Sequence, residues 1–301
     1  MSAASGTVLI TGATGMIGRH AAADLERRGF RVIATARRNA PVSCDLLAQG
    51  ERRALIGAHR PSHLLHLAWE TRHGHFWTAP ENDQWLAASR DLLRVFAAAG
   101  GKRAVVAGTC AEYDWPRLGA RPVAETALLG PKTPYGIAKH ALHRALAELA
   151  AQEGLSYAWG RVFLLVGAGE HPDRLVPSVA RALLANLPAN CTAGRQRRDF
   201  MDTRDAGAGF AALLASEVAG AVNIGTGVAH SVAEAAETLG RLSGRPDLIR
   251  LGALPSRADD PPYLVADTGR LAAEVGFRAE IGFERMLADA LEWWRQQGKI
   301  A

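Results

Sequence analysis

The first half of the chain alternates short apolar runs with longer segments of helical composition. Apolar, β-branched runs that predict strands lie at residues 7–10, 31–35, 63–67, 104–107 and 158–165. Segments that predict helices lie at 17–28, 82–99 and 135–153. Strands that alternate with helices indicate a parallel sheet covered by helices on both faces. The expected fold class is therefore α/β, with a doubly wound parallel sheet.

The second half is less regular, and prolines interrupt its helix-like stretch at 174–185. One more strand is predicted at 222–225, and an amphipathic helix at 283–297. We therefore expect two domains. The larger comprises residues 1–165 plus about 205–230, and a smaller C-terminal domain comprises about 166–204 plus 231–301.

The composition mainly excludes certain classes of protein. Hydrophobic residues make up 48% and charged residues 22% of the 301, which is typical of a globular protein and not of a disordered one. No run of about 18 uncharged apolar residues occurs, so no membrane span is expected. The formal charge is +5, yet the arginines are scattered among acidic residues and no nucleic-acid-binding motif accompanies them. We expect neither a membrane nor a nucleic acid as partner.

The N-terminus and the cysteines bear on location. Residues 1–6 lack the basic segment and the cleavage site of a secretion signal. Cys44, Cys110 and Cys191 are far apart and form no CxxC pair, which argues against a disulfide framework or a structural zinc site. Histidines cluster between positions 59 and 75, but without a helical HxxxH, and no metal site is expected. These features indicate a cytoplasmic protein.

A glycine-rich turn, TGATGMIG at 11–18, follows the first strand and precedes a helix. Gly12 permits a tight turn, Gly15 lets the backbone approach a pyrophosphate at the helix N-terminus, and Gly18 lets the helix lie close to the sheet. This context favours dinucleotide binding over a turn without a ligand. The turn residues expected to contact the cofactor are Gly12, Thr14, Gly15, Met16 and Ile17.

The end of the second strand bears on which dinucleotide fits. An NAD site places Asp or Glu there to hold the ribose 2′-hydroxyl, but this chain has TARR at 35–38. The guanidinium groups of Arg37 and Arg38 suit a 2′-phosphate, so NADP(H) is favoured and NAD(H) stays possible. Both arginines could instead be solvated loop charges. Asp45 and Leu46 follow, and the Asp45 carboxylate would either bond the adenine edge or cap the next helix.

Tyr135 and Lys139 lie four residues apart at the predicted start of a helix. This spacing places both side chains on one face. An ammonium near a phenol stabilises the phenolate, so we expect Lys139 to lower the pKa of Tyr135 from about 10. That would give an acid/base able to work near neutral pH. A YxxxK is frequent by chance, but the glycine turn upstream favours the catalytic interpretation.

Together, these features resemble the extended short-chain dehydrogenase/reductase family, in its nucleotide-sugar epimerase/dehydratase group. The resemblance is carried by TGATGMIG at 11–18, GTCAEY at 108–113, TPYGIAK at 133–139 and RRDFMDTRDAG at 197–207. It implies a Rossmann-type dinucleotide-binding domain and a smaller C-terminal substrate-binding domain.

The resemblance also implies roles for single residues. Thr109, Tyr135 and Lys139 would be catalytic, with Lys139 also binding the nicotinamide ribose. Leu67 and Ala68 would pass under the cofactor. A homodimer through the helices at 82–99 and 135–152 is expected on the same ground.

The family catalyses several reactions on one scaffold, so the fold does not choose among them. In its dehydratases an Asp-Glu pair follows the active-site threonine, and Cys110-Ala111 stands there in this chain, which disfavours a dehydratase. Glu112, one place later, keeps that option open. The segments LAW at 67–69 and GHFWTAPEN at 74–82 resemble those of a 4-ketoreductase subgroup that acts on 4-keto-6-deoxy nucleotide sugars.

The leading prediction is an NADP(H)-dependent enzyme that reduces the 4-keto group of a nucleotide-linked 4-keto-6-deoxyhexose, in deoxysugar and polysaccharide biosynthesis. Tyr135 would protonate the developing alkoxide, assisted by Thr109 and Lys139. One alternative is a nucleotide-sugar 4-epimerase with tightly bound NAD(P)+. A second is a non-catalytic NADP-sensing protein, although a sensor needs no proton donor.

Candidate substrate residues complete the prediction. Arg174 and Arg198 could hold the diphosphate of the nucleotide sugar, or could be surface charges in salt bridges. Trp69 and Trp77 would wall the sugar site or simply pack. Cys110 would line the pocket or be a small buried hydrophobe. The family commonly has an amide at position 164, which touches the substrate, and this chain has a leucine there.

Overall fold

The structure of the protein, a computed structural model, describes residues 6–256 and 260–298. The expected lack of a secretion signal rests mainly on residues 1–5, which lie outside these ranges. Within them, no helix combines the length and the hydropathy that crossing a membrane requires.

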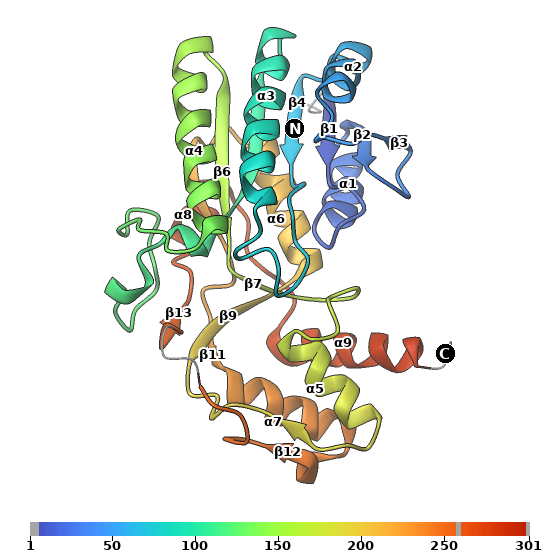
Figure 1. Cartoon of the computed structure of the whole chain (residues 1–301), viewed down its shortest axis with the longest axis vertical. Helices are drawn as coiled ribbons and strands as arrows, with labels where there is room; N and C mark the ends of the chain where they lie inside the picture. Colours follow the sequence, from blue (N-terminus) through green and yellow to red (C-terminus); the bar gives the residue numbers. More distant parts are fainter. Residues whose placement is uncertain (1–5, 257–259, 299–301) are drawn as a thin grey trace.

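A seven-stranded parallel sheet forms the larger part of the molecule (Figure 1). Its strand order is β10-β6-β5-β4-β1-β2-β3, and all neighbouring strands in it are parallel. The strands are β1 Thr7–Thr11, β2 Arg31–Ala36, β3 Val42–Ser43, β4 His63–His66, β5 Arg103–Thr109, β6 Ser156–Val162 and β10 Gly220–Ile224. The chain builds outward from β1 to β3 and then returns to place β4 on the other side of β1. The carboxyl ends of strands at such a reversal form the usual ligand crevice of an α/β sheet.

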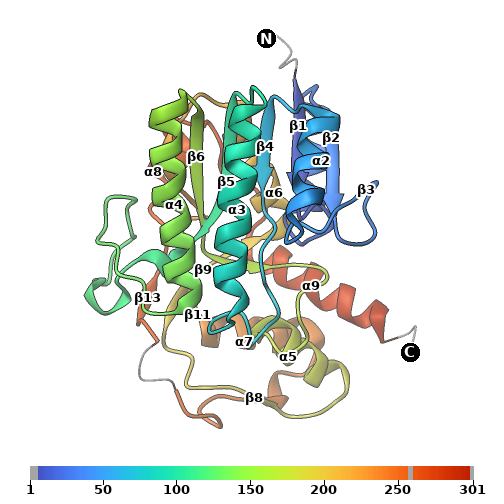
Figure 2. The same cartoon turned by 45° about the horizontal axis from the view of Figure 1, so that its top comes forward.

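Helices cover both faces of this sheet (Figure 2). One face carries α2 Gln49–His59, α3 Glu81–Ala98 and α4 Pro134–Glu153, and the other carries α1 Gly18–Arg27 and α6 Thr203–Ala215. Leu9 packs in the core beneath α2, α3 and α4, whereas its neighbours Val8 and Ile10 pack in the core beneath α1 and α6. Successive side chains of a strand point to opposite faces, which explains why a strand covered on both sides is apolar throughout. The predicted doubly wound α/β fold is confirmed.

A smaller part lies below the carboxyl ends of the sheet strands in Figure 1. Its strands pair in the order β11-β9-β13, with β7 also on β9, and separately as β12-β8. They are β7 Leu164–Val166, β8 Ala189–Asn190, β9 Arg197–Asp202, β11 Ala229–Ser231, β12 Ile249–Arg250 and β13 Tyr263–Leu264. The helices α5 Leu175–Leu184, α7 Val232–Ser243 and α9 Phe283–Gln297 pack with them around a separate apolar core.

Short elements complete the chain, and they are α8 Gly269–Ala273 and the 3-10 turns η1 Cys110–Glu112, η2 Trp115–Arg117 and η3 Pro246–Leu248. The smaller part is assembled from two stretches of sequence, because α6 and β10 return to the large sheet between them. The domain boundaries given above stay a prediction.

Candidate active site

The glycine-rich turn lies between β1 and α1, at the point where the strand order reverses. Gly12 has a φ of +70°, and a Cβ there would stand 2.9 Å from the backbone nitrogen of Ala68. A Cβ on Gly18 would stand 2.3 Å from the carbonyl oxygen of Gly12. No side chain of the described residues caps α1, so no side chain competes with an anion at the positive end of this helix. The turn therefore fits the pyrophosphate of a dinucleotide.

The ends of β1 and β4 are held together beside this turn. His66 Nδ1 lies 2.7 Å from Thr11 Oγ1, and His66 Nε2 lies 2.8 Å from Ser89 Oγ of α3. The backbone N–H of Leu67 donates to Thr11 Oγ1 at 3.2 Å. Burial lowers the pKa of His66 to about 3, so its ring is neutral. These bonds fix the segment that carries Leu67 and Ala68.

A cleft of about 1190 Å³ extends from the turn across the carboxyl ends of the strands. This exceeds the roughly 300–1,000 Å³ of a typical small-ligand pocket, which leaves room for a dinucleotide and a second ligand. The predicted cofactor residues that line it are Gly12, Thr14, Gly15, Met16, Ile17, Arg37, Arg38, Leu46, Leu67, Ala68, Tyr135 and Lys139.

Asp45 is the member of the predicted cofactor set that does not line the cleft. Its carboxylate accepts the backbone N–H of Leu47 at 3.0 Å, and its own N–H donates to Glu51 at 2.6 Å. The residue at the N-cap of α2 is Ala48, so Asp45 is not that cap either. Its carboxylate instead stabilises the turn that precedes the helix.

Tyr135 lies in the first turn of α4 and Lys139 one turn later. The helix begins there because Pro134 occupies its first position and Thr133 caps it, with the Thr133 hydroxyl accepting the N–H of Gly136 at 3.1 Å. Thr109, the last residue of β5, lines the cleft with them. The structure thus brings the three predicted catalytic residues to one cavity from two elements.

The expected lowering of the Tyr135 pKa is wrong in direction. Burial raises the pKa of Tyr135 above its usual value, and a hydrogen bond with the Thr109 side chain acts in the opposite sense. Burial also lowers the pKa of Lys139 to about 7. Lys139 Nζ donates to the carbonyl oxygen of Ala107 at 2.9 Å and lies 4.0 Å from the ring centroid of Trp69. At neutral pH Tyr135 therefore carries its proton, which suits a proton donor.

Glu112 does not reach the cleft. It is fully buried, and its carboxylate accepts the backbone N–H of Thr109 at 2.9 Å and the Nε–H of Arg161 at 3.2 Å. These bonds hold the carboxylate outside the cleft, so the structure gives no support to the dehydratase option. Cys110 does line the cleft, and burial raises its pKa to about 12, so it is a neutral thiol on the wall.

The predicted substrate residues divide into two groups. Trp69, Trp77, Cys110 and Arg174 line the cleft. Arg198 is not among its lining residues, and its Nη2 lies 2.5 Å from Asp260 Oδ1. To meet a diphosphate in the cleft, Arg198 would have to leave this ion pair.

Comparison with known proteins adds to this geometry. The model of the NAD-dependent epimerase/dehydratase family matches residues 8–225. The chain belongs to this family. The UDP-glucose 4-epimerase of Streptomyces lividans is 26% identical over 96% of this chain and 96% of its own length. A dTDP-6-deoxy-L-talose 4-dehydrogenase (NAD(+)) of Aggregatibacter actinomycetemcomitans is 26% identical over 76% of this chain and 88% of its own.

A solved structure agrees in fold along the whole chain. It is the UDP-glucose-4-epimerase of Stenotrophomonas maltophila with bound NAD and formylated UDP-arabinopyranose. It is 26% identical, covers 98% of this chain and 100% of its own, and superposes with a TM-score of 0.87.

Sequence reasoning missed several cleft residues of this epimerase/dehydratase family member. One of them, Phe76, packs edge-on to Tyr135 at 4.9 Å between ring centroids, beside the predicted Trp77, which does so at 5.8 Å. Trp293 and Trp294 of α9 also line the cleft. Aromatic spacing in the sequence gave no signal for these contacts, because they join elements far apart in the chain.

Glu170 is a further acidic residue of the cleft that the sequence did not single out. It is 4% exposed, its Oε1 lies 3.0 Å from Arg174 Nε, and its Oε2 has no hydrogen-bond partner among the described residues. Burial raises its pKa to about 7, against the opposite effect of the Arg174 charge. The carboxyl therefore carries a proton for part of the time at neutral pH.

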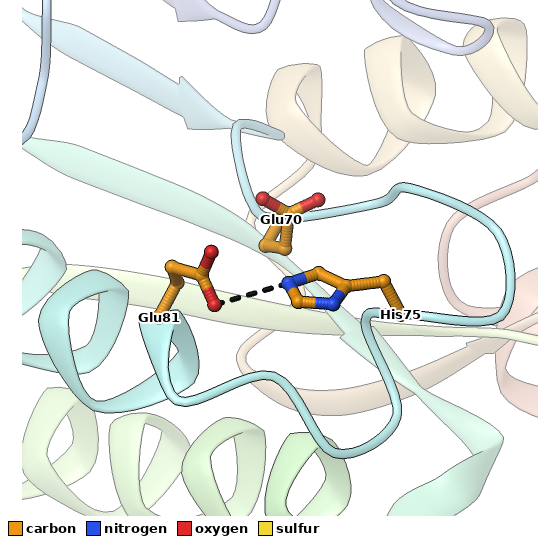
Figure 3. Close-up of side chains that lie close together, drawn as sticks. All are labelled: Glu70, His75 and Glu81. Atoms are coloured by element: carbon orange, nitrogen blue, oxygen red, sulfur yellow. Dashed lines mark hydrogen bonds and ion pairs between the residues drawn. The ribbon is translucent and has the colours of Figure 1, made fainter.

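Glu70, His75 and Glu81 converge on the segment between β4 and α3, as Figure 3 shows. Their ligand atoms lie within 4.8 Å of one another, and His75 Nε2 lies 3.1 Å from Glu81 Oε2. Arg72 already pairs with both carboxylates, at 3.0 Å from Glu70 and 2.9 Å from Glu81. The group is therefore balanced by a guanidinium, and we assign no metal to it.

Proposed function

We propose that this chain is a nucleotide-sugar 4-epimerase that works with a bound NAD(P)+. The observation that carries the proposal is the convergence of Thr109, Tyr135 and Lys139 on the cleft that begins at the glycine turn. The similarity to UDP-glucose 4-epimerases over nearly the full length of both chains supports it.

The proposed chemistry is proton transfer by Tyr135 at the C4 oxygen of the sugar. A bound nicotinamide supplies the complementary step, which is acceptance and return of hydride at C4. Tyr135, in its phenolate form, takes the proton of the C4 hydroxyl when the carbonyl forms. The resulting neutral phenol returns that proton to the C4 oxygen when the opposite face is reduced. Thr109 donates a hydrogen bond to the same oxygen, and the charge of Lys139 stabilises the phenolate. The raised pKa of Tyr135 favours the proton-donating half of the cycle.

A second candidate is an NADP(H)-dependent 4-ketoreductase of a nucleotide-linked 4-keto-6-deoxyhexose. The observation that favours it is the pair Arg37 and Arg38, exposed on the cleft directly after β2, where an acidic residue would suit NAD. The similarity to a dTDP-6-deoxy-L-talose 4-dehydrogenase supports the same chemistry at C4. The third possibility, a sensor without activity, has no observation in its favour.

One experiment separates these candidates. Purified protein is incubated with UDP-glucose and with nucleotide-linked 4-keto-6-deoxyhexoses, each with NAD+, NADH, NADP+ and NADPH in separate reactions. Formation of the C4 epimer without net change of the cofactor would establish the epimerase. Stoichiometric oxidation of NADPH by a keto sugar would establish the reductase instead. No epimer and no cofactor turnover with any sugar would remove both.

A further inference from the structure

A buried carboxylate lies directly behind the three proposed catalytic residues. Glu112 ends the turn η1 that follows β5, and it is fully buried. Space for it exists because Gly108 has no side chain. A Cβ there would stand 2.7 Å from Glu112 Oε1 and 2.1 Å from Trp159 Nε1.

Hydrogen bonds fix this carboxylate in one orientation. Oε1 accepts the backbone N–H of Thr109 at 2.9 Å and the indole N–H of Trp159 at 2.8 Å. Oε2 accepts the Nε–H of Arg161 at 3.2 Å. Together with the Thr109 hydroxyl, which accepts the N–H of Ala111 at 3.2 Å, these bonds form a capping box around η1. The backbone of Thr109 is therefore tied to Glu112.

The carboxylate of Glu112 and the amine of Lys139 meet the same short stretch of β5: Glu112 Oε1 lies against Gly108, and Lys139 Nζ donates to the carbonyl oxygen of Ala107 at 2.9 Å. The negative charge of Glu112 raises the pKa of Lys139, whereas burial of the amine lowers it to about 7. The other groups that face the pair are few. Arg161 of β6 pairs with Glu112 on the side of Oε2. The titratable neighbours that are neutral near pH 7 are His66 of β4, His143 and Tyr135 of α4, and Cys110 and Tyr113 beside η1. His140 of α4 also faces Glu112, and burial lowers its pKa while the Glu112 charge acts in the opposite sense.

We propose that Glu112 is a positioning residue of the active site: its carboxylate fixes Thr109 through the backbone and keeps the positive charge on Lys139. The effect on turnover rests on the proposed function, whereas the effect on the Lys139 charge does not. A fully buried carboxylate in this place, paired with Arg161, can act on Thr109 and Lys139 from outside the cleft.

The test variant removes the charge of the Glu112 side chain and keeps its shape. In Glu112→Gln the amide oxygen can still accept the N–H of Thr109, but the negative charge is lost. The titration of Lys139 is followed by NMR of protein labelled with 15N in its lysine amines, with and without NADP+. The chain has only four lysines, and the signal missing from Lys139→Met identifies Lys139. We expect the titration midpoint to fall by on the order of one pH unit in Glu112→Gln. An unchanged midpoint would overturn the proposal.

Two further variants separate charge from structure. Glu112→Asp keeps the charge but is too short to hold Thr109 in the same way, so the Lys139 midpoint should stay near that of the unmodified protein. Tyr113→Phe removes a hydroxyl that donates to Asn223 at 2.7 Å and accepts from Arg161 at 3.2 Å, in the same buried network. This hydroxyl carries no charge, so the midpoint of the Lys139 titration should not move in Tyr113→Phe. A shift in either variant as large as that in Glu112→Gln would overturn the proposal.

Turnover provides an independent readout. In Glu112→Gln the alkaline limb of the kcat–pH profile should move to lower pH, while KM for the cofactor stays unchanged. Absence of any C4 activity in the unmodified protein would remove the proposed function and leave the NMR result standing. An active protein whose Lys139 titration ignores Glu112 would remove this inference and leave the proposed function standing.

Discussion

At the scale of single residues, the Tyr135 hydroxyl is the group whose loss should stop proton transfer with least damage elsewhere. Tyr135→Phe keeps the ring that packs against Phe76 and Trp77. We expect kcat for the C4 reaction to fall by roughly 10²–10⁴, while cofactor affinity, measured by fluorescence titration, stays the same. Near-normal turnover of this variant would contradict the role given to Tyr135.

The cofactor choice also belongs to this scale. Arg37→Ser combined with Arg38→Ser removes two guanidinium groups that can bind a 2′-phosphate. Hydrogen bonds to charged groups contribute about 1.5–3 kcal/mol, so the Kd for NADPH should rise at least about tenfold while that for NADH changes little. Calorimetric titration with both cofactors measures this. Arg53→Ser is the matched control, since Arg53 is an exposed arginine of α2 outside the cleft. An equal loss of NADH and NADPH affinity would count against a phosphate contact.

At the scale of elements, two helix N-caps offer a matched pair. Thr133 caps α4, which carries Tyr135 and Lys139, whereas Ser231 caps α7 in the smaller part of the molecule. Each change to alanine should lower the free energy of unfolding by about 1 kcal/mol, because one backbone N–H loses its partner. Thr133→Ala should also lower kcat, because the first turn of α4 loosens. Denaturant unfolding and kinetics on both variants check this, and a comparable kcat loss in Ser231→Ala would contradict it.

The sequence predicted the elements whose apolar pattern is continuous and missed those that polar residues interrupt. The helix expected at 283–297 coincides with α9, because a regular apolar stripe defines it. The strand β9 has the sequence RRDFMD and yet is almost entirely buried. Asp199 accepts backbone N–H groups of Thr226, Gly227 and Ala266, and Arg198 pairs with Asp260. These partners come from distant parts of the chain, so local polarity conceals the strand.

The same distinction applies to the site. Gly12, Tyr135 and Lys139 were recognisable because their function requires fixed spacing within one local element. The buried role of Glu112 and the place of Glu170 in the cleft were not, since burial depends on tertiary neighbours such as Arg161 and Arg174. The predicted direction of the Tyr135 pKa shift was wrong for this reason too: the sequence shows an amine four residues away, but it does not show the burial that raises the pKa.

At the scale of the whole molecule, two histidines, the buried His66 and the half-buried His143, should govern the response to acid. Burial lowers the pKa of His66 and of His143 to about 3 in the folded protein, compared with a usual value of 6.5. Between these values the unfolded chain binds protons that the folded chain does not. The free energy of unfolding should therefore fall as pH drops from about 6.5 towards 3, by up to roughly 1.4 kcal/mol per pH unit for each histidine. Above that window their contribution to stability is fully present.

Glu170 should change the free energy of unfolding with pH in the opposite direction, so its contribution can be separated from that of the histidines. Its folded pKa of about 7 lies above the usual 4.5, so its contribution to stability falls as pH rises from about 4.5 to 7. Urea unfolding across this range should give a shallower acid-side slope for His66→Gln and for His143→Gln than for the unmodified protein. Glu170→Gln should give a steeper rise of stability with pH. His59→Gln, at the half-exposed end of α2, is the control and should leave the slope unchanged. If His66→Gln and His143→Gln both kept the acid-side slope of the unmodified protein, other groups would control the stability in acid.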